Sequence, residues 1–215
     1  DVKMNAFGVR VDTELITGAL AVDSVSTQKL TDEAYRITGL DNPNSPGQIQ
    51  QWLTESQGVE IPNLQKATVA ETLKREDLPE EARRVLEIRQ QLGKTSVKKY
   101  TAMDTAKCGD DRIRGLTQFY GANRTGRWAR RLVQLQNLPS NYLKTLEYAR
   151  NLVKAQNYEG IRLQYGNVPD TLSQLIRTAF VPSEGHKFVV ADFSAIEARV
   201  IAWLAGEQWV NEVFA

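Results

Sequence analysis

The feature that most constrains the fold of this chain is a short apolar run that ends on an aspartate. Residues 188–191 (Phe-Val-Val-Ala) follow a turn at Gly185, and this composition is typical of a buried strand. Ser194 and Glu197 have the spacing of a capping box, so a helix is expected to begin there. Its apolar stripe is expected to pack inward and consists of Ile196, Val200, Trp203 and Leu204. The sequence therefore predicts a strand, a sharp turn and a helix.

This arrangement gives Asp192 two possible roles. At a strand end beside a helix N-terminus, its carboxylate can hold a hard cation whose other ligands are substrate phosphates. Alternatively, Asp192 and Glu197 only cap the helix, which is the commonest function of such residues. The stretch on its own leaves both interpretations open.

Composition excludes several classes of protein. The chain has 215 residues, 41% of them hydrophobic and 25% charged, which is ordinary for a globular protein of one or two domains. Cys108 is the only cysteine and His186 the only histidine, which excludes a disulfide framework and a Cys/His zinc cluster. No apolar run approaches the ~20 residues that span a bilayer, so we expect a soluble, intracellular protein without a membrane partner. The missing initial Met and the apolar helical pattern at residues 209–214 suggest a fragment.

The pattern along the chain predicts an α+β fold. Helices are expected at residues 13–39, from Ser45 onward, at 67–75 and at 79–102. The sequence pattern changes near Asp104. Residues 112–120 have the composition of a strand, and Arg-rich irregular or extended structure is expected from there to Pro139. Helices are expected at 140–156 and 169–179. We therefore predict a helical domain over residues 1–106 and a mixed domain with short, mostly antiparallel strands over residues 107–215.

A basic stretch interrupts an otherwise balanced charge distribution. The net charge is +1, yet residues 112–146 contain no Asp or Glu and seven Lys or Arg. Within it, "TGRWARRLVQLQNLP" spans residues 125–139. The guanidinium groups of Arg127, Arg130 and Arg131 match phosphate oxygens and base-edge acceptors, and the amides of Gln136 and Asn137 suit minor-groove acceptors. A solvated basic loop is the alternative.

Three ordered motifs resemble those of the family A DNA polymerases, most closely the bacteriophage branch. They are Thr-Gly-Arg at 125–127, Leu-Gln-Asn-Leu-Pro at 135–139, and Asp-Phe-Ser-x-Ile-Glu-x-Arg at 192–199. The resemblance covers essentially the whole chain. It implies that residues 1–106 correspond to the helical thumb and residues 107–215 to the first part of the palm.

The resemblance also implies roles for individual residues. Asp192 matches the first of two metal-binding catalytic aspartates, and the main-chain carbonyl of Phe193 matches another metal ligand. Glu197 matches the residue that occludes the sugar 2′-hydroxyl and so selects deoxynucleotides, and Arg199 matches the arginine that closes the palm motif. The family's DNA contacts are matched by Arg127, Gln136 and Asn137.

The sequence departs from the family pattern at two positions. Phe193 stands where many relatives have Tyr, which removes a hydroxyl but keeps the ring and the carbonyl ligand. Ala195 stands where many have Gln, which removes a polar contact. In the family, two Mg²⁺ ions need a second aspartate, which, like the fingers that grip the triphosphate, lies beyond Ala215 in the family's order.

Other candidate residues carry weaker signals. Lys94, Lys98 and Lys99 either line the thumb tip, where the family touches duplex backbone, or form a solvated face. Asp110 and Asp111 could be a metal pair, although a strand-entry turn is favoured. Tyr120 and Trp128 could stack on nucleic-acid bases, although core packing of their rings is favoured. His186 has no nucleophile assigned beside it, so a catalytic triad is not expected.

The sequence thus predicts part of a template-directed DNA polymerase that transfers dNTPs to a primer 3′-hydroxyl by a two-metal mechanism. Its expected partners are primer–template DNA, dNTPs, and the missing fingers and C-terminal palm, in cis or as another chain. The chain alone is expected to be inactive. The alternative is a non-catalytic DNA-binding module or one subunit of a split polymerase. If the source is a phage or prophage, the expected location is the host bacterial cytoplasm.

Overall fold

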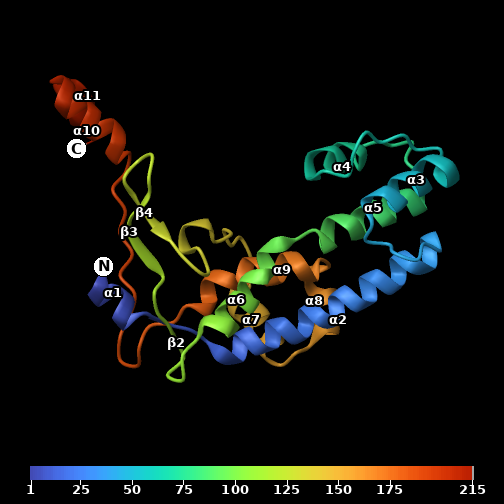
Figure 1. The fold of residues 1–215 in the computed structure, drawn as a ribbon, viewed down its shortest axis with the longest axis horizontal. Helices are drawn as coiled ribbons and strands as arrows, with labels where there is room; N and C mark the ends of the chain where they lie inside the picture. The colour runs from blue at the N-terminus through green and yellow to red at the C-terminus, as the bar shows by residue number, and fades with distance from the viewer. Residues whose placement is uncertain (215) are drawn as a thin grey trace. The chain divides into compact units, whose positions relative to one another are not determined.

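The chain forms two compact units, Asp1–Val181 and Pro182–Ala215. A computed structural model describes residues 1–214, apart from the side chain of Asn211. Helices predominate, and two small antiparallel sheets complete the fold, which confirms the predicted α+β class (Figure 1). None of the helices in this described range is long and apolar enough to cross a membrane.

The elements of unit 1 before residue 107 are mostly helical. They are α1 (Val2–Phe7), β1 (Val9–Arg10), α2 (Thr13–Thr38), α3 (Pro46–Gln57), α4 (Lys66–Thr72), α5 (Glu80–Leu92), η1 (Thr95–Val97) and α6 (Lys98–Ala106). The helices predicted from residue 13, from Ser45 and near residue 67 are confirmed, and the Ser45 side chain caps α3 by accepting a hydrogen bond from the Gln48 N–H.

The single helix predicted over residues 79–102 is wrong, because it is broken into α5, η1 and α6. After Gly93 the backbone of Lys94 leaves helical geometry, with ψ at 84°. Tertiary contacts stabilise this break: the Lys94 ammonium pairs with the Asp170 carboxylate, and the hydroxyls of Ser96 and Ser173 are hydrogen-bonded at 2.8 Å. Local helical periodicity could not reveal contacts with residues more than 70 positions away.

The elements of unit 1 after residue 107 are mixed. They are β2 (Arg112–Ile113), β3 (Thr117–Ala122), β4 (Arg127–Arg130), η2 (Leu135–Asn137), α7 (Leu146–Lys154), α8 (Tyr158–Tyr165), α9 (Val168–Leu175) and η3 (Ile176–Ala179). The strand predicted over residues 112–120 is divided at Gly115, where φ is +69°, so β2 pairs with β1 and β3 pairs with β4. The helix predicted from residue 140 begins only at Leu146, and α8 was not predicted.

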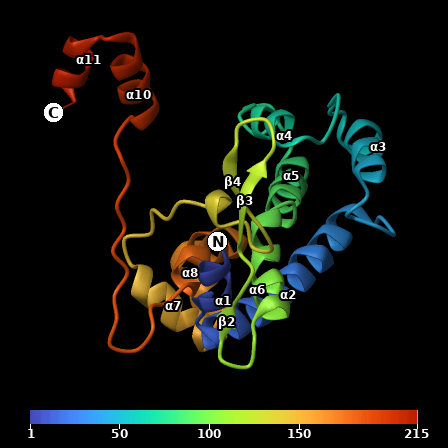
Figure 2. The ribbon, with the colours of Figure 1, turned by 60° about the vertical axis from the view of Figure 1, so that its left-hand side comes forward.

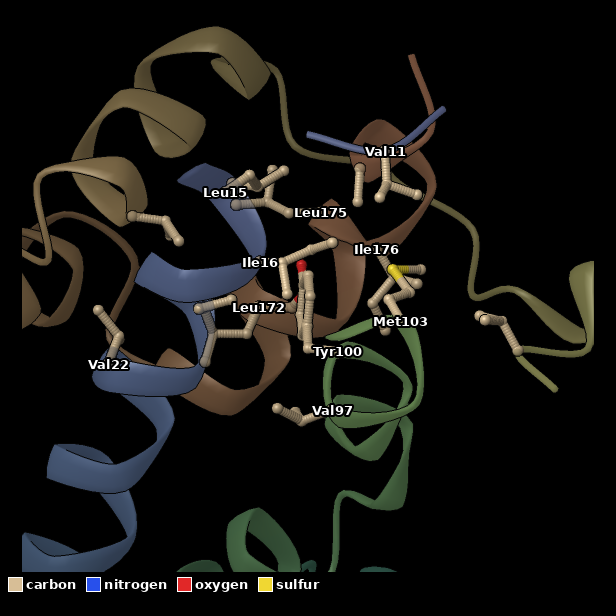
Figure 3. Packing of buried hydrophobic residues seen from close by; sticks show 14 of the residues in the cluster. Val11, Leu15, Ile16, Val22, Val97, Tyr100, Met103, Leu172, Leu175 and Ile176 are labelled. Carbon is tan, nitrogen blue, oxygen red and sulfur yellow. The ribbon is translucent and has the colours of Figure 1, made fainter. Parts of the chain in front are cut away.

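The main core of unit 1 joins segments far apart in the sequence (Figure 3). Leu15 and Ile16 of α2, Tyr100 of α6, and Leu172 of α9 are fully buried in it. The Tyr100 hydroxyl donates to the main-chain carbonyl of Leu172 at 2.8 Å, which satisfies the buried polar end of the ring. This core therefore takes residues from both sides of the predicted domain division after residue 106, which stays a prediction.

A second core lies under α3, α4 and α5, with Leu53 and Leu86 completely buried. Along α2 and α5, which lie side by side in Figures 1 and 2, Arg84 forms a two-pronged ion pair with Glu33 at 2.6 and 2.8 Å. The buried side chains of the second core and this ion pair together stabilise the helical arm formed by residues 13–92.

Unit 2 contains α10 (Ile196–Ala205) and α11 (Gln208–Val213). The strand predicted over residues 188–191 is wrong: in the described part of unit 2 this stretch is extended but pairs with no strand, and Val189 and Val190 are 84% and 91% exposed. A strand needs a neighbour to satisfy its main-chain groups, and sequence pattern alone does not supply one.

Candidate nucleic-acid and metal site

The basic motif around Arg127 forms a β-hairpin. Strands β3 and β4 pair antiparallel, with Ala122 opposite Arg127 and Thr117 opposite Arg130. The turn between them contains Arg124 and Gly126, where φ is +66° and an added Cβ would lie 2.8 Å from the ring of Tyr120. Arg127 lies at the exposed tip of β4, so its charge is presented on the surface.

Helix α1 anchors the base of this hairpin. The Asn5 side chain accepts hydrogen bonds from both the main-chain N–H and the hydroxyl of Thr117, at 2.9 Å each, and donates to the Thr117 carbonyl at 2.7 Å. The Asp1 carboxylate accepts from the Phe119 N–H at 3.2 Å. Sequence reasoning missed this anchor, because a single Asn gives no periodic signal.

The segment that carries Gln136 and Asn137 is held by its main chain. Lys99 donates to the Val133 carbonyl at 2.5 Å, and Arg177 donates to the carbonyls of Leu138 and Pro139 at 3.1 and 3.0 Å. The side chains of Gln136 and Asn137 are exposed on η2 between these anchors. The amides are therefore presented to solvent from a fixed backbone.

The three predicted thumb lysines have different environments. Lys98 is exposed, whereas Lys94 pairs with Asp170 and Lys99 binds Val133, and burial lowers the pKa of the Lys99 ammonium. Asp170 joins three segments, because it also accepts from the Tyr142 hydroxyl at 3.0 Å. Burial alone would raise the pKa of Asp170, but its hydrogen bonds with Lys94, Gln174 and Tyr142 lower it on balance.

The turn interpretation of Asp110 is confirmed. Its carboxylate accepts two hydrogen bonds from the Arg114 guanidinium, at 2.8 and 2.6 Å, and this partner lowers the pKa of Asp110 to about 2. The core packing favoured for Tyr120 and Trp128 is wrong, because these side chains are 58% and 41% exposed on the hairpin.

In unit 2, Asp192 and Phe193 lie in the segment before α10, and both are exposed. The predicted capping box is wrong: Ala195 occupies the N-cap position with φ at +50°, and no side chain caps the helix. The Ser194 carbonyl instead accepts from the Arg199 Nε at 2.9 Å.

Arg199 is the residue that organises this unit. Besides binding Ser194, its Nη2 donates to the Phe214 carbonyl at 2.6 Å, and its guanidinium lies 5.0 Å from the centroid of the Phe214 ring. Arg199 thus links the start of α10 to the end of α11. The inward packing predicted for the stripe of α10 is wrong within this unit, since Trp203 and Leu204 are each 72% exposed.

The donors present suit part of a magnesium site. An exposed carboxylate next to a main-chain carbonyl, Asp192 and Phe193, is a hard-oxygen pair of the kind that Mg²⁺ accepts while keeping waters and substrate oxygens as other ligands. Across residues 1–214, no three His, Cys, Asp or Glu side chains gather to form a complete metal site.

The chain thus has a basic, exposed hairpin in unit 1 and, in unit 2, an exposed aspartate in the segment before α10. Residues 22–215 match the family model of DNA polymerase family A, so the chain belongs to that family. Over its whole length it is 56% identical to a DNA polymerase of Bacillus phage SP02. It is also 30% identical, over 99% of its length, to a thermostable DNA polymerase I of Thermus thermophilus. The chain spans 33% of the phage relative and 23% of the Thermus one.

Proposed function

We propose that the chain is the DNA-holding thumb and the first part of the palm of a template-directed DNA polymerase. The observation that carries this proposal is the family match over residues 22–215, a range that includes the exposed basic hairpin. Primer–template DNA is the partner of Arg127, Arg130, Arg131, Gln136 and Asn137. Lys94, Lys98 and Lys99 contribute further contacts with the phosphate backbone of the DNA, and Lys98 is the exposed one of the three.

The catalytic part of the proposal concerns unit 2. The Asp192 carboxylate and the Phe193 carbonyl would hold Mg²⁺, and Glu197, on the first turn of α10, would select deoxynucleotides. When bound, Mg²⁺ would supply the positive charge that the primer 3′-hydroxyl and the triphosphate need for nucleotidyl transfer. Arg199 positions this segment by fixing the main chain of Ser194 at one end and of Phe214 at the other.

We further propose that this chain does not polymerise alone. Asp192 supplies one carboxylate, whereas a pair of bridged metal ions needs more. Ile201, Trp203 and Trp209 are at least 65% exposed, which supports contact with a complementary polymerase part, in cis or as a separate chain. If the source is a phage or prophage, this assembly acts in the host bacterial cytoplasm.

The test is the binding of the 215-residue chain to a recessed primer–template duplex, measured by fluorescence anisotropy over a salt series. We expect log affinity to fall linearly with log salt, with a slope of about −0.9 for each phosphate contact. Arg127→Gln should weaken binding and reduce the magnitude of the slope by about one.

The matched control is Arg162→Gln, which removes an exposed arginine of α8 that pairs with Glu159 at 2.9 Å and has no proposed DNA contact. It should bind as the unaltered chain does. Absence of duplex binding at low salt would refute the proposal for unit 1. Mg²⁺-dependent primer extension by the pure chain would refute the proposed inactivity.

A further inference from the structure

The hairpin contains an irregularity that presents aromatic rings. Regular pairing resumes on both sides of it, at Gln118 opposite Ala129 and Ala122 opposite Arg127, so residues 119–121 face Trp128 alone. A bulge of this kind redirects side chains out of the normal alternation. Tyr120 adopts a φ of +53°, which is unfavourable for a bulky residue, and strained backbone of this kind clusters at functional sites.

The rings that the bulge presents form one cluster. The centroids of Phe119 and Trp128 lie 5.4 Å apart in an edge-to-face arrangement, and those of Phe119 and Tyr120 lie 6.4 Å apart. Phe119, Tyr120 and Trp128 are nevertheless 63%, 58% and 41% exposed. A contiguous exposed apolar surface of this kind marks a binding site, because leaving it in water has a cost in free energy.

The charge around the cluster identifies the kind of partner. Arg124 lies in the hairpin turn, Arg127 and Arg130 lie in β4, and Arg131 follows directly. In the sequence no acidic residue lies between Arg112 and Leu146; Asp1 brings one carboxylate to the hairpin, where it accepts from the Phe119 N–H, and the four arginines outnumber it. Aromatic rings interspersed with arginines bind single-stranded nucleic acid, because bases stack on the rings and phosphates pair with the guanidinium groups.

We propose that Phe119, Tyr120 and Trp128 form a stacking platform for unpaired bases of a DNA strand that extends from the bound duplex. This inference rests on the proposed function, because the same hairpin holds the duplex through Arg127. The hydrogen bonds from Thr117 to Asn5 and from Phe119 to Asp1 fix the backbone under the platform. The platform is therefore organised before DNA binds, which reduces the entropic cost of binding.

The test compares three DNAs: a blunt duplex, the same duplex with a single-stranded overhang, and the single strand alone. The unaltered chain should bind the overhang duplex more tightly than the blunt one. Trp128→Leu, which keeps apolar volume but removes the ring, should reduce affinity for the overhang duplex about tenfold, the scale of one stacked base. Trp128→Phe, which keeps a ring, should retain most of the affinity.

Two controls keep the result specific. Tyr148→Leu removes a 53% exposed ring from α7 and should leave binding to all three DNAs unchanged. Circular dichroism checks folding; if Trp128→Leu disturbs the hairpin, Tyr120→Leu is the second variant, with the same expected loss. In each stacking variant the salt slope should stay unchanged, because no phosphate contact is removed.

The outcomes separate this inference from the proposed function. Salt-dependent duplex binding with no gain from the overhang would overturn the platform and leave the DNA-holding role intact. An overhang gain that survives both leucine variants would also overturn it and would make the cluster a contact for another protein. Absence of binding to every DNA would overturn both proposals.

Discussion

The hairpin β3–β4 and the segment before α10 both carry predicted site residues, but they are held in different ways. The hairpin is anchored by side chains from α1, above all by the three hydrogen bonds between Asn5 and Thr117. Residues 188–193 are exposed throughout and form no strand. The difference shows that the hairpin backbone is organised within unit 1 itself, whereas the described chain provides no strand partner for residues 188–191.

The boundary between these two situations lies close to Val181. There the Val181 N–H donates to the Arg10 carbonyl at 3.0 Å, and the Asp12 N–H donates to the Ala179 carbonyl at 2.8 Å. Arg150 donates to the Thr178 carbonyl and pairs with the Asp12 carboxylate at 2.8 Å. The last residues of unit 1 are thus fixed by ion pairs and main-chain hydrogen bonds.

The largest expected effect concerns Asp192. In a polymerase that combines this chain with a complementary part, Asp192→Asn should reduce primer extension by at least about 10²–10³-fold, the scale seen when a group that stabilises transition-state charge is removed. Primer extension under single-turnover conditions measures it. Asp41→Asn, an exposed aspartate outside both candidate sites, is the control. Activity near that of the unaltered enzyme would contradict the metal-binding role and remove the main functional contrast between the two regions.

The next effect concerns Asp12, whose side chain is 11% exposed. Burial alone would raise its pKa, but hydrogen bonds from Lys154 and the Leu15 N–H, with the charges of Lys154 and Arg150, lower it on balance. The resulting stability is present above the unfolded-state pKa of 3.8 and is lost as the pH falls through the lower folded-state pKa.

Asp12→Asn should therefore lower the free energy of unfolding at pH 7 by about 1.5–3 kcal/mol, while the amide still caps α2. It should also reduce the loss of stability below pH ~4. Urea unfolding followed by circular dichroism between pH 2.5 and 7 measures both. Glu14→Gln, which removes an 80% exposed carboxylate 3.4 Å from Lys154, is the control and should change little. If Asp12→Asn lost as much stability between pH ~4 and 2.5 as the unaltered chain, the stabilising role assigned to the Asp12 carboxylate would be contradicted.

The smallest expected effect concerns Asn5. Asn5→Ala should destabilise the base of the hairpin by about 1–2 kcal/mol, because it leaves part-buried main-chain groups of Thr117 without their partner. Hydrogen exchange should speed up at the amides of residues 117–119 and stay fast and unchanged at residues 188–192. Equal exchange in the two regions of the unaltered chain would show that the anchor does not distinguish them.

Sequence patterns predicted the features that depend on neighbouring residues. The cap at Ser45 and the turn at Asp110 both follow from local chemistry. The order of the motifs was sufficient to identify the family.

Sequence patterns failed where distant residues decide the structure. The helix break at Lys94 depends on Asp170, and the strand expected over residues 188–191 has no partner in the described chain. The favoured burial of Tyr120 and Trp128 is wrong: Tyr120 lies in the irregularity between Gln118 and Ala122, and the hairpin leaves both rings exposed. The position of Asn5 under the hairpin, 112 residues from Thr117 in sequence, had no local signal.

The composition of the main core has a consequence for synthesis and folding of the chain. Leu15 and Ile16 of α2 lie in one buried cluster with Leu172 and Leu175 of α9, so these apolar partners leave the ribosome about 160 residues later. Long-range contacts of this kind raise the contact order and slow folding. A truncation after residue 106 would remove the residues of this core from Ile113 to Ala179 and leave the apolar face of α2 exposed, whereas a division after Val181 would keep the whole core in one unit.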